Sequence, residues 1–179
     1  LFTCDPYSKV VDASDKNTSL LFSDASTVTY LRSDRLSSKK KSEFELGNFL
    51  FSTKGCDGNA LNNDSLKLHM DGRKIFNFAA KEVPNHVTKI LKNSNRLIEE
   101  IDLFIFHQGS KAILNYLEKK LFIKKNQFDS NLINTGNTVS SSIPFLLENI
   151  LKKYDKKTIL LSGFGVGLSW ATCIIERKK

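Results

Sequence analysis

The chain has 179 residues, of which 40% are apolar and 26% are charged, and 27 Lys and Arg against 19 Asp and Glu give a formal net charge of +8. This length predicts one domain with a substantial core, and with 9 Gly and 3 Pro the composition excludes intrinsic disorder, collagen-like repeats and Pro-rich recognition segments. Three Cys without a Cys-x-x-Cys pair exclude a disulfide framework and a closed structural zinc site. They indicate reduced thiols in a cytoplasmic protein.

No apolar run approaches the roughly 20 residues needed to span a bilayer, and no secretory signal opens the chain. We therefore expect no membrane association and no export. The chain starts at Leu1 rather than Met, in an apolar Leu-Phe pair. We interpret this start as a cut through a longer protein.

The first part of the chain predicts strands and a linker. Residues 19–23 (SLLFS) and 27–31 (TVTYL) are short runs of apolar, aromatic and β-branched residues that predict two adjacent strands. From Arg32 to Glu45 the chain is polar and contains the run Ser-Ser-Lys-Lys-Lys-Ser, which is typical of a solvated linker. Residues 48–53 (NFLFST) predict another strand, and residues 54–65, rich in Gly and Asn, predict a loop.

Helices and strands alternate through the rest of the chain. Apolar residues recur at helical spacing from 71 to about 93, although Pro84 should kink or split this helix. Residues 102–106 (DLFIF) predict a strand buried on both faces, and residues 113–121 carry a helical stripe. There follow an extended piece at 128–134, a helix at 143–151, a strand at 158–161, a glycine turn at 163–167 and a last strand at 170–175. This alternation predicts an α/β fold whose sheet is covered by helices on both faces.

Three places bring polar groups to the end of a strand or the start of a helix, where backbone groups and helix dipoles converge. His107 directly follows the strand at 102–106, Asn137 precedes the helix that contains Pro144, and the third place is the glycine turn. Each also has a structural interpretation: a hydrogen-bonded His, an Asn that caps a helix or a turn, and a tight turn between paired strands. The glycines lack the Gly-Lys-Ser/Thr of a phosphate loop, so a nucleotide site is only weakly indicated.

Together these groups suggest one kind of chemistry. A His and an Asn can both donate hydrogen bonds to a thioester oxygen that becomes negative when a carbanion forms, and the N–H groups of a glycine turn can hold a second oxyanion. The chain offers no matching nucleophile. Cys4 and Cys173 lie in strand-like surroundings and are expected as small apolar core residues, and Cys56 has an acidic neighbour that would raise the pKa of its thiol.

These motifs resemble one family, the β-ketoacyl-acyl-carrier-protein synthase III group of the thiolase fold. Residues 106–110 (FHQGS) resemble its His-Gln-Ala-Asn, residues 136–144 (GNTVSSSIP) its Gly-Asn-Thr-Ser-Ala-Ala-Ser-Ile-Pro, and residues 163–170 (GFGVGLSW) its closing Phe-Gly-Gly-Gly-Phe-Thr-Trp. Residues 5–24 resemble a stretch that ends in Leu-Phe-Gly-Asp, and residues 70–76 (MDGRKIF) the segment that opens the family's second half. Order and spacing agree almost from end to end.

The resemblance implies a molecule of two similar halves, each a five-stranded sheet with helices, packed as α-β-α-β-α layers. Residues 1–45 would be the tail of the N-terminal half with a linker, and residues 46–179 would be the C-terminal half with the order βαβαβαββ. The family's active site uses Cys, His and Asn, and the Cys would lie upstream of Leu1. We therefore expect this fragment alone to form no acyl-enzyme.

The implied activity is that of an acyltransferase of fatty-acid or related lipid biosynthesis, which condenses an acyl-CoA with malonyl-acyl carrier protein in a decarboxylating Claisen reaction. His107 and Asn137 would be the catalytic side chains that hold the malonyl thioester oxygen, and the backbone N–H of Val166 would hold the tetrahedral oxyanion. The tunnel for coenzyme A and the carrier-protein arm would be lined by Gly72, Phe76, Ser110 and Phe164. Ser110 replaces an Asn of the family and Ala112 a common Arg, which leaves the acyl donor and the pathway open.

The partners follow from the same resemblance. Acyl carrier proteins are acidic, so Lys111, Lys119 and Lys120 could form their docking face, although a solvated helix face explains these lysines equally well. No nucleic-acid-binding pattern accompanies the positive charge. A full-length protein of this family would be a homodimer and would need no metal or cofactor beyond its coenzyme A thioester substrate. The alternative is a noncatalytic half-domain, or a subunit of a degenerate synthase, that binds coenzyme A or a carrier protein.

Overall fold

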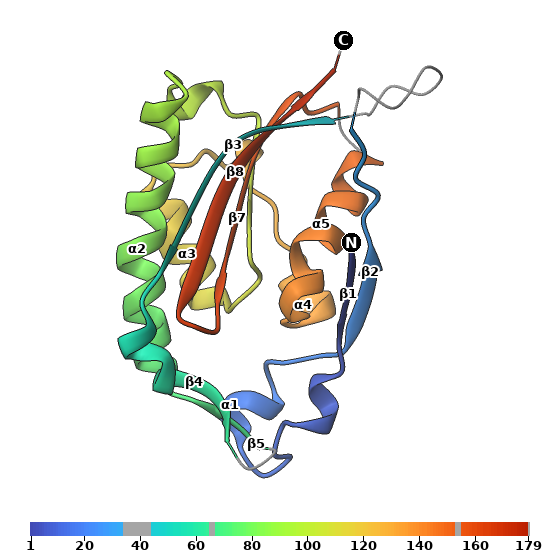
Figure 1. Ribbon diagram of the computed structural model, residues 1–179, viewed down its shortest axis with the longest axis vertical. Helices are drawn as coiled ribbons and strands as arrows, with labels where there is room; N and C mark the ends of the chain where they lie inside the picture. Colours follow the sequence, from blue (N-terminus) through green and yellow to red (C-terminus); the bar gives the residue numbers. More distant parts are fainter. Residues whose placement is uncertain (34–43, 65–66, 153–154, 179) are drawn as a thin grey trace.

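The computed structural model describes residues 1–33, 44–64, 67–152 and 155–178, and its centre is a four-stranded mixed sheet. The strands are β3 (Phe44–Thr53), β6 (Leu103–Phe106), β7 (Thr158–Gly165) and β8 (Ser169–Arg177), in the order β3-β8-β7-β6 (Figure 1). The β6 and β7 strands run parallel, and the other two pairs are antiparallel. The lysine-rich run of the expected linker lies outside the described residues.

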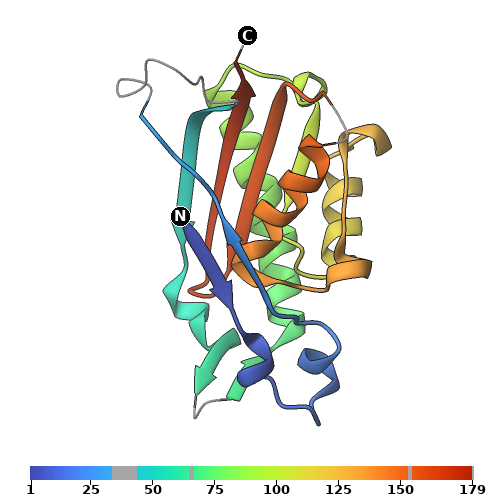
Figure 2. The ribbon, with the colours of Figure 1, turned by 90° about the vertical axis from the view of Figure 1, so that its right-hand side faces the viewer.

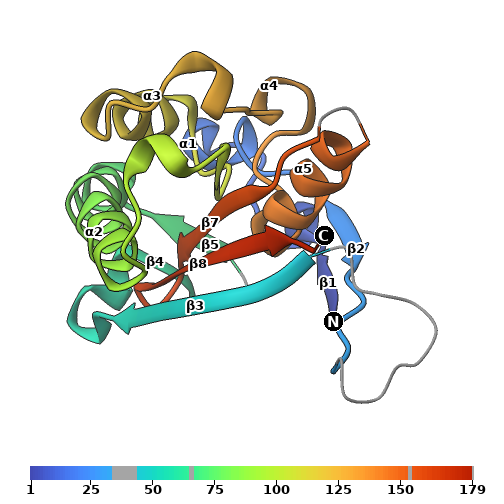
Figure 3. The same cartoon turned by 90° about the horizontal axis from the view of Figure 1, so that it is seen from above.

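Helices cover the two faces of this sheet. On one face lie α2 (Gly72–Asn93) and α3 (Lys111–Lys120), and on the other lies α5 (Ser142–Leu151) (Figure 3). Because successive side chains of a strand point to opposite faces, Phe104 and Phe106 pack in the core of α2 and α3, whereas Leu103 and Ile105 pack against α5. The predicted α/β fold with a helix-covered sheet is confirmed.

Of the two outcomes predicted for Pro84, a kink or a split, the split does not occur in α2. The helix runs without a break over 22 residues, and Asp71 caps its start by accepting a hydrogen bond from the Lys74 N–H at 3.0 Å. A proline in a helix interior costs about 3 kcal/mol through its missing N–H and its ring. Val83, Val87 and Ile90 beside it are completely buried, and this packing offsets that cost.

The predicted extended piece at 128–134 is wrong as a strand. Only Phe128 pairs there, in a single parallel bridge to Phe104 of β6, and the chain then enters the short helix α4 (Leu132–Thr135). The βαβαβαββ order therefore lacks its third strand in the described residues. The bridge lies at the β6 edge, where a fifth strand of the sheet would pair.

The N-terminal residues form a separate two-stranded sheet of β1 (Phe2–Asp5) and β2 (Ala25–Val28), which crosses α5 (Figure 2). The strand predicted at 27–31 is therefore displaced to 25–28. The strand predicted at 19–23 is wrong: α1 (Lys16–Ser19) ends there, and the following segment makes one bridge, between Phe22 and Asn137. The boundary expected at residue 45 falls just inside β3 and stays a prediction.

The predicted loop at 54–65 contains regular structure. A 3₁₀ segment at Gly55–Ala60 leads into β4 (Leu61–Asp64), which pairs with β5 (Lys67–Met70). Of the two cysteines expected in the core, Cys173 is buried, but Cys4 is exposed on β1. In the described ranges no helix combines the length and apolar character required to cross a membrane.

Candidate active site

A cavity of about 400 Å³ lies where β6 and β7 end, and it brings together groups that are far apart in the sequence. His107 and Asn137 both line it, as does Val166 of the glycine turn. Most of the remaining lining is apolar and comes from the N-terminal segment, β4, β5, α2, α3, α5 and β7. Its principal apolar side chains are Tyr7, Phe22, Met70, Ile75, Ile113 and Phe164.

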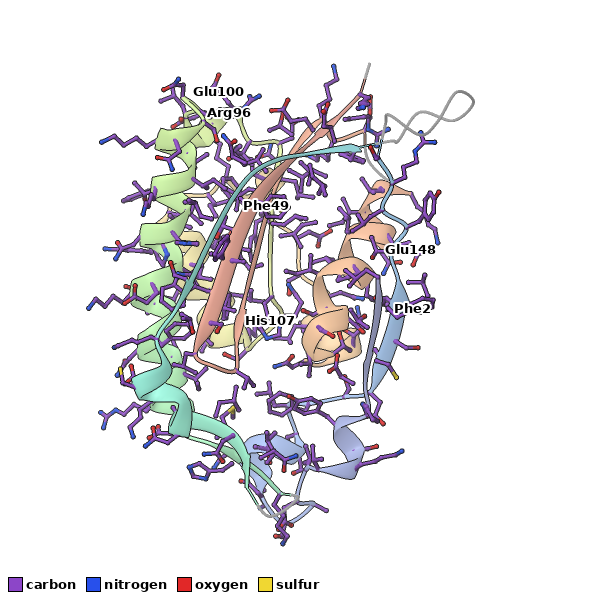
Figure 4. The ribbon with its side chains drawn as sticks, in the orientation of Figure 1. Phe2, Phe49, Arg96, Glu100, His107 and Glu148 are labelled. Carbon is purple, nitrogen blue, oxygen red and sulfur yellow. The ribbon has the colours of Figure 1, made fainter. Side chains whose placement is uncertain are left out.

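His107 is fixed by the strand that precedes it. Its backbone N–H donates to the Ser162 carbonyl at 2.9 Å, which extends the pairing of β6 with β7 by one residue. Its Nδ1 lies 2.8 Å from Ser142 Oγ at the start of α5, and the Phe164 ring packs against it edge-on at 5.2 Å between centroids. Figure 4 shows the ring between the sheet and α5.

Burial lowers the pKa of His107 to about 4. A hydrogen bond between the ring and the Val139 backbone has a smaller effect that raises this pKa. The imidazole is therefore neutral near pH 7. A neutral imidazole has one ring N–H and one lone pair, so it can donate one hydrogen bond without carrying a positive charge. This is a suitable state for a group that stabilises a developing oxyanion.

Asn137 is 4% exposed and is held by both its side chain and its backbone. Its Oδ1 accepts a hydrogen bond from the Val139 N–H at 3.0 Å. This is the local turn that Asn forms with the backbone two residues further on, as the structural interpretation of Asn137 predicts. Within the part of the chain that the structure describes, its Nδ2 makes only a long hydrogen bond of 3.4 Å, to the Gly109 carbonyl. The carboxamide is thus oriented by its oxygen, and its N–H donors have capacity for a ligand in the cavity.

Four residues of the N-terminal segment, Thr3, Asp5, Leu21 and Ser23, hold the Asn137 loop, and we call them the N-terminal clamp. The Leu21 carbonyl accepts from the Asn137 N–H at 2.8 Å, and the Ser23 N–H donates to the Asn137 carbonyl at 3.0 Å. On the other side, Thr3 Oγ1 lies 2.8 Å from Ser141 Oγ. The Asp5 carboxylate accepts from the N–H and the hydroxyl of Ser140.

The glycine turn connects β7 to β8, as the structural interpretation predicts. Lys54 supports it by exchanging two backbone hydrogen bonds with Leu168, at 2.7 and 3.3 Å. Val166 lines the cavity and is 57% exposed. Its role with an oxyanion stays a prediction.

The cavity includes three of the four expected tunnel residues. Gly72, Ser110 and Phe164 line it, and Ser110 also caps α3 by accepting from the Ile113 N–H at 3.3 Å. Phe76 is not among the lining residues and instead packs edge-on against Tyr116 at 5.6 Å.

The three lysines expected at a docking face are exposed but do not share one face. At about 100° per residue, Lys120 points about 180° away from Lys111 around the α3 axis, and Lys119 lies between them. With a rise of about 1.5 Å per residue, Lys119 and Lys120 are about 12 to 14 Å further along the helix. Only Lys111 lies at the end of α3 that reaches the cavity.

None of the three cysteines, all of which the structure describes, lines the cavity. Cys56 is exposed beside Asp57, and burial raises the pKa of the Cys173 thiol to about 11. The sequence does not predict the apolar lining from residues 1–31 or the contact of Ser142 with His107. The short apolar run at 19–23 is the available signal for the lining, although its pattern predicts a strand.

A neutral His and an oriented Asn beside a backbone turn, at the strand ends of this mixed sheet, fit the thiolase-type fold that the family motifs imply. The family model for the C-terminal part of 3-oxoacyl-[acyl-carrier-protein (ACP)] synthase III matches residues 91–177. The chain is 34% identical over 183 residues to β-ketoacyl-[acyl-carrier-protein] synthase III of Lactococcus lactis subsp. lactis, covering 95% of this chain and 56% of that protein. The corresponding protein of Streptococcus agalactiae is 36% identical over 190 residues, covering 94% of this chain and 56% of its own length.

Solved structures agree. The 3-oxoacyl-[acyl-carrier-protein] synthase III of Aquifex aeolicus superposes with a TM-score of 0.87 at 28% identity, covering 98% of this chain and 56% of that one. The chain belongs to the β-ketoacyl-[acyl-carrier-protein] synthase III family and corresponds to its C-terminal part. It spans about half the length of the curated relatives it matches.

Proposed function

We propose that the protein carrying these residues is an acyltransferase that condenses an acyl-CoA with malonyl-acyl carrier protein, releasing carbon dioxide. The observation that supports this most directly is the shared cavity of His107 and Asn137, with a part-buried, neutral imidazole beside an oriented carboxamide. Two neutral donors at one place fit an oxygen that gains negative charge during the reaction. The named relatives are synthases of this kind.

In the proposed reaction, the bond between the malonyl methylene carbon and its carboxylate carbon breaks, and carbon dioxide leaves. The electron pair moves into an enolate whose oxygen accepts hydrogen bonds from His107 and Asn137. The methylene carbon then attacks the carbonyl carbon of an acyl-Cys thioester, and the tetrahedral oxyanion is held by the Val166 backbone N–H. Collapse of this intermediate expels the thiolate, which a Cys outside these 179 residues provides.

The apolar lining suits the pantetheine arm shared by coenzyme A and the carrier protein. Gly72, Ser110 and Phe164 contact this arm in the proposal, and Phe76 supports the tunnel wall from behind through Tyr116. Lys111, near the cavity, meets the acidic carrier protein first, and Lys119 and Lys120 extend the positive field along α3. Reversal of charge at Lys111 should weaken carrier-protein binding more than reversal at Lys120.

We further propose a cytoplasmic homodimer that binds neither nucleic acid nor membrane and requires no cofactor beyond the thioester substrates. The three cysteines form no disulfide, in keeping with a reducing compartment. Gel filtration of the whole protein tests the dimer.

The catalytic proposal is tested by decarboxylation of a malonyl thioester by the whole protein. His107→Ala and Asn137→Ala should each lower the rate about 100- to 1,000-fold, the usual effect of losing one oxyanion donor. His69→Ala, at an exposed position of β5, is the matched control and should leave the rate unchanged. Parental decarboxylation by either cavity variant would refute the proposal.

The absence of a cysteine from the cavity lining favours one second candidate, a noncatalytic half-domain or degenerate subunit that binds coenzyme A or carrier protein. Labelling with radioactive acyl-CoA separates the two. A stoichiometric thioester on the whole protein, absent from the 179-residue chain alone, supports the condensing enzyme. Binding of coenzyme A without any thioester in the whole protein supports the second candidate.

A further inference from the structure

Gln108 is a buried residue beside His107 that the proposed reaction does not use, and it is not among the residues that line the cavity. Its side-chain Nε2 donates to the Phe106 carbonyl at 2.8 Å. Its Oε1 accepts from the Ser130 hydroxyl at 2.8 Å and from the Asn131 N–H at 3.2 Å. The side chain therefore connects the end of β6 to the segment that leads into α4.

The direction of these three hydrogen bonds is fixed by the groups around the carboxamide. A backbone carbonyl can only accept and a backbone N–H can only donate, so Nε2 faces Phe106 and Oε1 faces Asn131. The Ser130 hydroxyl is then the donor of its bond, because Oε1 carries no proton. The carboxamide thus has one orientation in which all three bonds form.

The carboxamide also continues the contact between two chain segments at the edge of the sheet. Phe104 of β6 forms a parallel bridge with Phe128. Two residues further along β6, the Gln108 side chain lies between the Phe106 carbonyl and the Asn131 N–H. It takes the place of a backbone hydrogen bond between the two segments and keeps them in register beyond the bridge.

The segment that Gln108 holds leads directly to Asn137 through a compact turn. Residues 132–136 lie between Asn131 and Asn137. The Asn131 carbonyl accepts from the Thr135 N–H at 3.1 Å, and the Leu132 carbonyl accepts from the Gly136 N–H at 2.8 Å. Because these bonds make the turn stiff, a displacement of Asn131 is passed on to Asn137.

We propose that Gln108 is a positioning residue that sets the distance between His107 and the Asn137 loop, so that both donors reach one oxygen in the cavity. The next residue, Gly109, meets the same loop at a second point through its carbonyl, 3.4 Å from Asn137 Nδ2. The inference deepens the proposed function and rests on it in one respect, that two donors act on the same oxygen. The place of the Asn137 loop is a property of the protein without substrate.

The first test is Gln108→Met in the whole protein, which keeps the length of the side chain and removes its three hydrogen bonds. The kcat for decarboxylation of a malonyl thioester should fall about 10- to 100-fold, because a misplacement of about 1 Å can cost about 100-fold. KM should change by less than about 3-fold, since Gln108 does not line the cavity.

Gln127→Met is the matched control, because Gln127 is a second buried glutamine whose side chain makes three hydrogen bonds. Its partners are the Lys124 N–H and the carbonyls of Ile98 and Ile101, which precede β6 and do not line the cavity. Gln127→Met should lower the unfolding midpoint in urea about as much as Gln108→Met does and leave kcat unchanged. An equal kcat in the two variants would overturn the proposal.

A double-mutant cycle separates positioning from a general loss of stability. In an Asn137→Ala background there is no distance between two donors left to set, so adding Gln108→Met should lower the rate by less than about 3-fold. A further loss as large as that in the parent would show that Gln108 does not act through Asn137.

Amide hydrogen exchange measures the position of the loop without substrate. Gln108→Met should speed exchange at residues 131–137 more than Gln127→Met does, and equal exchange in the two variants would count against the proposal. Failure of the proposed function would appear instead as normal decarboxylation in His107→Ala, which leaves the exchange result intact. If Gln108→Met does not fold, Ser130→Ala removes one of the three bonds at an exposed residue. Its kcat should fall to a smaller extent, and an unchanged kcat would contradict the proposal.

Discussion

His107 combines a ring that is basic in water with a site where its protonation is costly. Burial lowers its pKa from 6.5 to about 4. As the pH falls from 6.5, the unfolded chain takes up a proton at this residue, whereas the folded chain does so only near pH 4. The folded state therefore keeps its full stability above this window and loses up to about 3 kcal/mol within it.

We expect His107→Gln to reduce the loss of stability between pH 6.5 and pH 4, as measured by urea unfolding at several pH values. The pKa of His86 is also lowered by burial, but that residue is present in both proteins and its effect cancels in the comparison. Equal pH dependence of parent and variant would contradict a lowered pKa of the imidazole at position 107.

Val139 is a β-branched residue in a backbone conformation that such residues rarely adopt. Its φ of 52° lies in the left-handed region, which costs a β-branched residue about 1–2 kcal/mol. The position is nonetheless needed, since its N–H orients Asn137. Val139→Asn should raise the free energy of unfolding by about 1 kcal/mol because Asn tolerates this region. Val139→Ala keeps Cβ and should show no such gain in thermal unfolding; equal stability of the two variants would argue against strain.

The loop before α5 leaves no room for a side chain at Gly136. Gly136 has a φ of +66°, and a Cβ there would lie 3.0 Å from both the Leu21 carbonyl oxygen and Ser23 Oγ. Gly136→Ala should therefore destabilise the protein by about 1–3 kcal/mol and displace Asn137. Gly55→Ala, where a Cβ meets nothing within 4 Å, should change stability by less than about 0.5 kcal/mol. Equal unfolding midpoints in urea for the two variants would contradict this fit.

The sequence predicts α2 from its long helical pattern and the short strand β6 from its unbroken apolar run. The structure of the short run at 19–23 could not be predicted from its pattern. Its apolar residues Leu21 and Phe22 line the cavity and do not pack in a sheet. His107 and Asn137 were predicted from their place at strand and helix ends and from the family motifs. Ser142 lies in a run of serines, and only the fold brings its hydroxyl to a ring 35 positions away.

At the scale of the whole molecule, β3 is an edge strand with one apolar face open to solvent. Phe51 is 84% exposed and Phe49 is 53% exposed in the described chain, on a strand of 10 residues. Long, apolar edge strands promote association between chains. Phe51→Lys should reduce concentration-dependent association of the 179-residue chain, measured by light scattering, without lowering its stability.

Phe122→Lys is the control, because Phe122 is 88% exposed but follows α3 and is not on a sheet edge. It should change association less than Phe51→Lys does. Equal effects of the two substitutions would show that general surface polarity, and not the open strand, governs association.

The N-terminal clamp also has a consequence for the order of folding. Its contacts join residues that are 112 to 138 positions apart, from Ser23 with Thr135 to Thr3 with Ser141. Closing such long loops costs chain entropy before any contact compensates for it, and contacts of this range form slowly. Asn137 therefore reaches its place only after the N-terminal segment and residues 135–141 have both been synthesised and brought together. A nascent chain on the ribosome can contain every residue of the His107 loop and still lack the pairing of His107 with Asn137 in one cavity.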